Sequence, residues 1–149
     1  MSRKLLNEEL NRLTTEEYKD AEKLPIVVVL DNVRSLNNIG SVFRTSDAFR
    51  LSKIYLCGIT ATPPHREIHK TALGAEESVD WEYFEETTDA VQALKNEGYT
   101  ILSVEQVENS ISLEQFTIKS GRKSFSVEAF QVVPASRISF GRYQLSAVK

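Results

Sequence analysis

The segment IVVVLDNVRSLNNIGSVFRTSDAF, residues 26–49, decides the fold because it joins a buried strand to an amphipathic helix. Its first six residues, 26–31, are mostly β-branched and show no polar alternation, which is typical of a parallel strand covered on both faces. A helix is expected from about Asn38 to Phe49, with Asn37 or Asn38 as its cap. A strand followed directly by a helix indicates an α/β fold.

The rest of the chain continues the alternation of strands and helices. Further strands are expected at residues 53–57, 81–84 and 99–105. Helices are expected near residues 66–73 and over 88–96. Two more are expected before the first strand, one over residues 5–13 and one that begins at a capping box formed by Thr14 and Glu17. The predicted fold class is therefore an open, mostly parallel α/β sheet with helices on both faces. Ligands of such sheets bind beyond the carboxyl ends of the strands.

Composition limits the class of protein. The chain has 149 residues, of which 41% are hydrophobic and 26% charged, as expected of one globular domain. The single cysteine, Cys57, excludes an internal disulfide, the charged N-terminus does not resemble a signal peptide, and no apolar run has transmembrane length. We expect a cytoplasmic protein without a membrane partner. The net charge of −3 provides no overall basic field, although a local patch can still bind phosphates.

The expected helix has two distinct faces. Its apolar stripe, which should pack on the sheet, consists of Ile39, Val42, Phe43 and Phe49. The opposite face places Arg44 among the small side chains of Ser41, Thr45 and Ala48. A long cation among small residues lets another surface approach, and Gly40 would leave the backbone open to a phosphate or a carboxylate. The alternative interpretation is a solvated arginine beside an ordinary capping asparagine and an ordinary glycine.

The run NNIGSVFRTSDAF resembles the first motif of the SpoU-type, or TrmH-like, RNA ribose methyltransferases of the SPOUT superfamily. In that motif Asn-x-Gly is followed four positions on by Arg-Thr. The preceding VVVLDNVRS and the following IYLCGITATPP and KTALGAEESVDW are similar to the same family in order and spacing. The resemblance extends over roughly residues 25–118 and rests on several separate segments.

The resemblance implies a fold, an activity and two catalytic residues. The family has an α/β fold with a C-terminal trefoil knot, works as a homodimer, and transfers a methyl group from S-adenosylmethionine to a ribose 2′-hydroxyl. Asn38 and Arg44 match its functional positions. A guanidinium stays protonated, so we expect Arg44 to orient the nucleotide and stabilise the forming alkoxide, in its own site or in that of the partner subunit. The 2′-hydroxyl implies RNA, and the short segment before the catalytic domain favours tRNA over rRNA.

Four residues are candidate contacts to RNA. They are Arg34, Gly40, Arg66 and Lys70. For the three cations, a phosphate contact and a solvated surface charge are both open interpretations. No residue is assigned to bind the cofactor.

Other noticeable side chains have simpler interpretations. His65 and His69 have the spacing of two zinc ligands on a helix, but no third ligand follows and no metal site is expected. Cys57 is expected to be a buried thiol at the end of a strand. The aromatic residues Trp81, Tyr83 and Phe84 are interpreted as sheet packing rather than as a platform for stacking bases.

The sequence divides into an N-terminal helical extension (1–24), an α/β core (25–120) and an atypical tail (121–149). The family has a second motif resembling Asn-Glu-x-x-Gly and a third resembling Pro-x-x-Gly followed by Ser-Leu-Asn-Val-Ser, which form the cofactor pocket and the knot. The tail GRKSFSVEAFQVVPASRISFGRYQLSAVK contains neither motif, and has five basic residues against one acidic residue. Three explanations of this tail are open: a shifted reading frame, a degenerate copy of the family, or a functional variant.

Two function classes follow. The first is an S-adenosylmethionine-dependent RNA 2′-O-methyltransferase. The second is a non-catalytic RNA-binding or dimerising remnant of that family, which would lack the cofactor pocket. Titration with the cofactor separates them. An unrelated nucleotide-binding domain is disfavoured because the chain has no GxGxxG or GxxxxGK[ST] loop.

Overall fold

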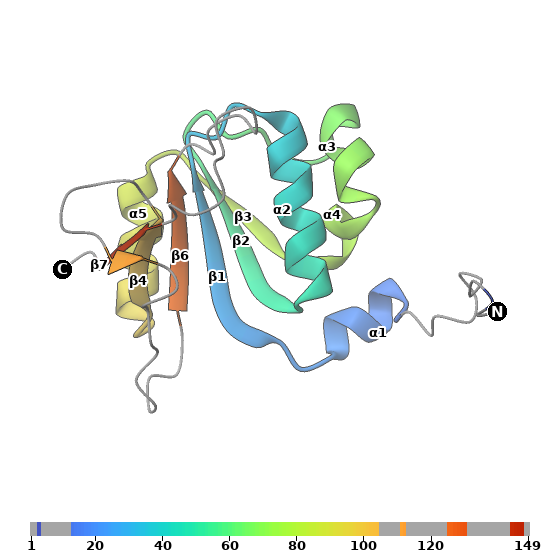
Figure 1. Ribbon diagram of the computed structural model, residues 1–149, viewed down its shortest axis with the longest axis horizontal. Helices are drawn as coiled ribbons and strands as arrows, with labels where there is room; N and C mark the ends of the chain where they lie inside the picture. The colour runs from blue at the N-terminus through green and yellow to red at the C-terminus, as the bar shows by residue number, and fades with distance from the viewer. Residues whose placement is uncertain (1–2, 4–12, 105–110, 113–124, 131–143, 148–149) are drawn as a thin grey trace.

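A computed structural model of the chain provides the architecture (Figure 1). It describes residues 3, 13–104, 111–112, 125–130 and 144–147, the last three ranges as backbone. The helix expected over residues 5–13 lies almost entirely outside this part.

Within the described residues, seven strands form one sheet in the order β3-β2-β1-β6-β4-β7-β5. The strands are β1 (Leu24–Asp31), β2 (Leu51–Cys57), β3 (Trp81–Phe84), β4 (Thr100–Val104), β5 (Ile111–Ser112), β6 (Phe125–Phe130) and β7 (Gln144–Ala147). The first five in spatial order are parallel, and β7 is antiparallel to β4 and to β5. The prediction of an open, mostly parallel sheet is confirmed.

Strand β1 lies at the centre of the parallel part. Its Val28 is opposite Ile54 of β2 on one side and Val127 of β6 on the other. Its Val27 and Val29 are buried, at 3% and 0% exposure. The apolar, β-branched sequence of this strand therefore suits a position between two neighbours and beneath two helical layers.

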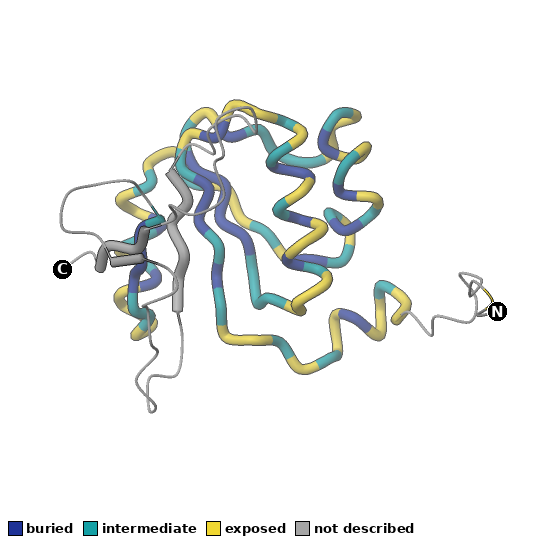
Figure 2. Tube along the Cα trace, viewed as in Figure 1, coloured by how far each residue is buried: buried dark blue, intermediate teal, exposed yellow. Residues whose placement is uncertain are grey.

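Five helices surround the sheet in the described part of the chain. They are α1 (Thr15–Asp20), α2 (Leu36–Ala48), α3 (Arg66–Ala72), α4 (Ala75–Ser78) and α5 (Thr87–Asn96). Helices α2, α3 and α4 lie on one side of the sheet and α5 on the other (Figure 1). Each side has its own buried apolar cluster, seen as dark blue segments in Figure 2. Helix α4 was not expected from the sequence, whereas α5 agrees with the helix expected over residues 88–96.

The boundaries of α2 differ from those predicted. The helix begins at Leu36 because Ser35 is its cap, with the Ser35 Oγ accepting a hydrogen bond of 3.2 Å from the Asn38 N–H. The expectation of an asparagine cap was wrong. Phe49 was also wrongly placed on the apolar stripe: the helix ends at Ala48, and Phe49 is 62% exposed.

The extension and the tail are both joined to the core. The capping box of Thr14 and Glu17 is confirmed, and Tyr18 of α1 is buried in the cluster beneath α2. Strand β6, which lies in the segment assigned to the tail, pairs in parallel with β1 and β4 (Figure 1), so the sheet extends beyond residue 120. The segments in which the cofactor loops and the knot were expected lie largely outside the described residues, at 121–124 and 131–143. No helix in the described ranges is long and apolar enough to span a bilayer.

Candidate functional site

The carboxyl ends of β1, β2 and β6 meet at one edge of the sheet. Asp31 ends β1 and is aligned with Cys57 of β2 and Phe130 of β6. The order in which strands are added to the sheet reverses at β1. Strands β2 and β3 lie on one side of β1, and β6 and β4 lie on the other. Such a switch point is where open α/β sheets bind ligands. Helix α2 begins at the same edge (Figure 1).

A network around Asn32 holds the loops of this edge together. Asn32 has a left-handed backbone (φ 51°), and its side chain accepts from the Ile59 N–H at 3.1 Å and donates to Asp31 Oδ1 at 2.7 Å. Thr87 of α5 also donates to Asp31 Oδ1. Gly58 (φ 62°) has no room for a side chain, because a Cβ would lie 2.3 Å from Asn32 Oδ1. This network therefore fixes the loop after β1 against the loop after β2.

A buried threonine fixes the next part of the same loop. The Thr60 hydroxyl accepts from the Val33 N–H at 2.9 Å and donates to the Leu30 carbonyl at 3.0 Å. Arg34 and Ser35 follow directly, so the entrance to α2 is rigidly connected to the sheet. Neither Asn32 nor Thr60 was predicted from the sequence. The available signal was an asparagine directly after a strand.

Arg44 stands exposed on the outer face of α2. Among the described residues, no ion pair involves its guanidinium. The neighbouring hydroxyls are already used, since Ser41 donates to the Asn37 carbonyl at 2.9 Å and Thr45 donates to the Ser41 carbonyl at 2.9 Å. The two hydroxyls therefore keep only acceptor capacity, whereas the guanidinium of Arg44 has hydrogen-bond donors to offer a ligand.

The side chains of Asn38 and Arg44 do not lie on the same side of the α2 helix of one subunit. Asn38 is half-buried in the first turn, near the strand ends. Six residues of helix place Arg44 about 9 Å farther along the axis and about 120° around it. The two side chains therefore address different parts of any ligand, or ligands in different places.

Gly40 has a packing role that the sequence did not reveal. It is buried, and a Cβ at this position would lie 2.3 Å from the Ile68 carbonyl oxygen and 2.1 Å from Thr71 Oγ1 of α3. The Thr71 hydroxyl also donates to the Asn37 carbonyl at 2.9 Å. The expectation that Gly40 leaves the backbone open to an anion was wrong, because α3 occupies that space.

The remaining candidate RNA contacts come from two places. Arg34 is exposed in the loop before α2, and Arg66 and Lys70 are exposed on α3. The Lys70 ammonium lies 2.7 Å from Glu67 Oε1, an exposed pair that contributes little to stability. Arg66 and Lys70 are four residues apart, so they share one side of α3.

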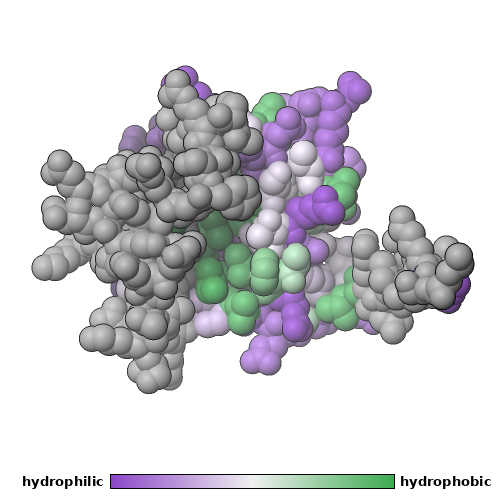
Figure 3. Space-filling view, viewed as in Figure 1, coloured by the Kyte–Doolittle hydropathy of each residue, from purple (hydrophilic) through white to green (hydrophobic). Residues whose placement is uncertain are grey.

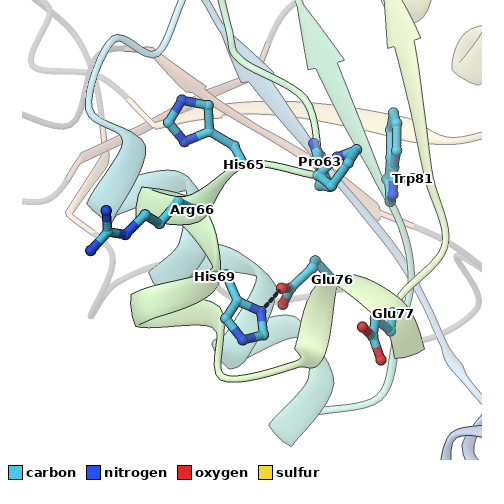
Figure 4. A pocket seen from close by; sticks show the side chains of 8 residues that line it. Pro63, His65, Arg66, His69, Glu76, Glu77 and Trp81 are labelled. Carbon is cyan, nitrogen blue, oxygen red and sulfur yellow. Dashed lines mark hydrogen bonds and ion pairs between the residues drawn. The ribbon is translucent and has the colours of Figure 1, made fainter.

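A pocket of about 510 Å³ lies beside α3 (Figure 4). It is lined by Pro63, Pro64, His65, Arg66, His69, Glu76, Glu77 and Trp81. The two histidines have separate partners: His65 caps α3 by accepting from the Glu67 N–H at 3.1 Å, and His69 Nδ1 contacts Glu76 Oε1. In the part of the chain that the structure describes, no three His, Cys, Asp or Glu side chains form a metal-binding group.

Cys57, Phe84 and Trp81 have the packing roles that were expected, whereas Tyr83 does not. Phe84 packs against Tyr55 with ring centroids 4.8 Å apart, and Cys57 is fully buried. Trp81 packs on the apolar cluster beneath α2 and also lines the pocket. The exposed Tyr83 donates to the Gly58 carbonyl at 2.8 Å, which adds a further tie to the strand-end loops.

Three side chains in or beside the core have shifted pKa values. Burial, followed by the charge of Asp47, raises the pKa of Tyr18 to about 12. Burial lowers the pKa of Lys23, whose ammonium lies 3.2 Å from the centre of the Tyr18 ring. Burial also raises the pKa of Tyr55. These shifts report packing rather than a catalytic acid or base.

Comparison with known proteins identifies relatives of this arrangement. The model of the SpoU rRNA Methylase family matches residues 25–132. A TrmH family protein of Staphylococcus saprophyticus, named for tRNA/rRNA methyltransferase activity, is 27% identical over 94 residues, which are 63% of this chain. The matched part is 37% of that relative's length, so the match spans well under half of the relative.

Two solved structures share the fold. The AdoMet-bound rRNA methyltransferase from Sinorhizobium meliloti superposes with a TM-score of 0.64 at 23% identity, over 77% of this chain and 43% of that one. The TrmH/SpoU tRNA modifying enzyme of A. aeolicus superposes with a TM-score of 0.63 at 16% identity, over 79% of this chain and 60% of that one.

Proposed function

The chain belongs to the SpoU rRNA Methylase family, and on this premise we propose that it methylates a ribose 2′-hydroxyl of RNA with S-adenosylmethionine as donor. The observation that carries the proposal is the position of Arg44. It is an exposed guanidinium, with no ion pair to any described residue, on the helix that starts at the strand-end edge. Arg44 belongs to the run NNIGSVFRTSDAF, one of the several segments that resemble the family.

Arg44 has an electrostatic role in this proposal. A guanidinium remains protonated at neutral pH and cannot accept the proton of the hydroxyl unaided. It orients the target nucleotide through its phosphate and stabilises the negative charge that develops on the 2′-oxygen. Asn38, at the first turn of α2, contributes polar contacts near the strand ends.

The methyl donor supplies an electrophilic methyl group on a sulfonium. The segments that the resemblance assigns to its pocket lie largely outside the described residues, so no described residue is assigned to hold it. The proposal for S-adenosylmethionine is supported by family membership and by the AdoMet-bound relative with the same fold.

The geometry of α2 supports the proposal of a homodimer. Because Asn38 and Arg44 point about 120° apart on one helix, a single subunit does not direct both at one hydroxyl. We propose that the Arg44 face, with its small neighbours Ser41 and Ala48, meets the ligand of the partner subunit. tRNA is the first substrate to test, with rRNA as the comparison.

The test is transfer of a labelled methyl group to RNA. Transfer to tRNA, followed by nuclease digestion, should yield a 2′-O-methylated nucleoside, and tRNA with a 2′-deoxy target position should accept nothing. Arg44→Ala should lower transfer by about 100-fold or more, as for loss of one transition-state contact. Lys95→Ala on α5 removes a comparable exposed cation on the far side of the sheet and should change nothing.

The alternative function, a non-catalytic remnant of the family, predicts different results. A remnant of the family would bind tRNA but neither bind S-adenosylmethionine in a titration nor transfer its methyl group. Full transfer by the Arg44→Ala variant would contradict the role given to this residue, even if the native chain is active.

A further inference from the structure

The pocket beside α3 contains a buried carboxylate that its surroundings do not satisfy. The Glu76 side chain is 9% exposed, and its Oε1 contacts His69. Its Oε2 is buried and has no hydrogen-bond partner among the residues that the structure describes. An unsatisfied buried oxygen costs about 1–3 kcal/mol, and more when it carries charge. Such an oxygen in a pocket is typical of an acceptor that a ligand completes.

The pocket walls have the chemistry of a nucleotide site. Pro63 and Trp81 provide apolar, flat surfaces on one side of Glu76, and His69 faces Glu76 from the other (Figure 4). Arg66 lies at the outer rim, with its guanidinium directed away from the floor (Figure 4). A flat apolar wall, an acceptor at the floor and a cation at the rim fit a base, its polar edge and its phosphate.

Access to the acceptor depends on one side chain. His69 is 64% exposed, whereas the Glu76 carboxylate beside it is buried. Rotation of the exposed His69 loses few packing contacts but breaks its contact with Glu76 Oε1, so a donor on the ligand must replace His69 there. A donor on the ligand then reaches the carboxylate from the open side of the pocket.

We propose that this pocket binds one nucleobase with an exocyclic amino group, on an RNA nucleotide other than the one that is methylated. The amino group of adenine, cytosine or guanine donates to Glu76, the base packs on Trp81, and the phosphate meets Arg66. Uracil is excluded because its single ring N–H is flanked by two carbonyl oxygens, which Glu76 and Glu77 repel. The inference rests on the proposed function, since that function supplies the RNA.

A lysine from a protein partner is the main competitor for a carboxylate site. Arg66 at the rim disfavours it, since two cations would then share one small pocket. The surface of the helical layer around this region is mostly hydrophilic (Figure 3), which suits a solvated nucleic acid.

Trp81 makes the experiment simple, because it is the one tryptophan of the chain. Its fluorescence is followed while AMP, CMP, GMP or UMP is added to the full chain. Saturable quenching by a nucleotide with an amino group, about tenfold tighter than by UMP, is expected. Glu76→Gln keeps the shape of the side chain and should weaken this binding about tenfold, or about 1.4 kcal/mol. Glu85→Gln, outside the pocket, should not.

A second comparison does not depend on the folding of the Glu76 variant. Arg66 is exposed, so Arg66→Ala should fold normally and should remove the advantage of AMP over adenosine. Equal binding of UMP, or no saturable quenching at millimolar nucleotide, would overturn the inference. So would a lysine-rich peptide that binds more tightly than every nucleotide, which would assign the pocket to a protein partner.

The two proposals fail in different ways. If the chain methylates tRNA while no nucleotide affects Trp81, the pocket inference is wrong and the methyltransferase proposal stands. If nucleotides with amino groups bind and methyl transfer is absent, the pocket stands and the catalytic proposal is wrong.

Discussion

Replacing Gly40 with alanine tests the packing of α2 against α3. In a helix interior alanine is about 1 kcal/mol more favourable than glycine, so the sequence alone predicts a more stable protein. The structure predicts the opposite sign. The added Cβ would lie 2.3 Å from the Ile68 carbonyl oxygen and 3.0 Å from the Ala72 nitrogen, both backbone atoms that cannot rotate away.

The expected cost follows from these distances. Contacts of Cβ atoms below 3.0 Å are essentially never seen, so α2 and α3 must separate by about 0.7 Å, the difference between 3.0 Å and 2.3 Å. Overpacking of this kind costs up to about 3 kcal/mol. After subtraction of the gain of about 1 kcal/mol from helix propensity, the net loss is about 2 kcal/mol. For a chain of this size the midpoint of thermal unfolding should fall by about 4–8 °C.

The assay is urea unfolding and thermal unfolding of the native chain and three variants. Ser41→Ala, one position along the same helix and exposed, should change stability by less than about 0.5 kcal/mol. Adding Thr71→Ala to Gly40→Ala removes the 2.1 Å contact with the threonine hydroxyl but leaves the carbonyl, so it should not restore stability. An increase in stability for Gly40→Ala would refute the close approach of the two helices.

Two further predictions concern the capping of α2 and the core. Ser35→Ala removes the acceptor for the Asn38 N–H and should lower the free energy of unfolding by about 1 kcal/mol. Ser35→Asp should keep that free energy close to the native value. A Ser35→Ala variant as stable as the native chain would contradict the role of Ser35 as the cap. Burial raises the pKa of Tyr18 from 10.0 to about 12, so its folded form favours the protonated phenol. Its contribution to stability is complete below about pH 10 and is lost as the pH rises towards 12, and Tyr55, whose pKa is also raised, acts in the same direction. Unfolding midpoints in urea between about pH 9 and 11 should therefore fall less steeply for Tyr18→Phe than for the native chain, and identical slopes would count against the shift.

Local sequence patterns were sufficient for most strands and helices. The β-branched run of 26–31 and the aromatic run of 81–84 appear as strands, since side-chain shape and periodicity act over a few neighbouring residues. The capping box at Thr14 was also found in this way. The cap of α2 was missed because Ser35 competes with two asparagines that have equal preference for the position, and only the position of the loop decides among them.

The candidate site was predictable in one part and not in another. Arg44 could be placed on the exposed face from helical periodicity, because burial on a helix repeats every 3.6 residues. The role of Gly40 could not, because its constraint comes from Ile68 and Thr71 on another helix. The Asn32 network likewise joins residues that are distant in sequence.

By itself the sequence determined the open α/β class, the central apolar strand and the exposed Arg44, because these depend on local periodicity and on the motif at residues 37–49. Only the tertiary structure decided that β6 lies between β1 and β4, and that α3, α4 and β3 enclose a pocket around Glu76. Strand order and pockets arise from contacts between segments far apart in the chain. Many alternative pairings satisfy the same local preferences, and the packing of the whole molecule selects among them.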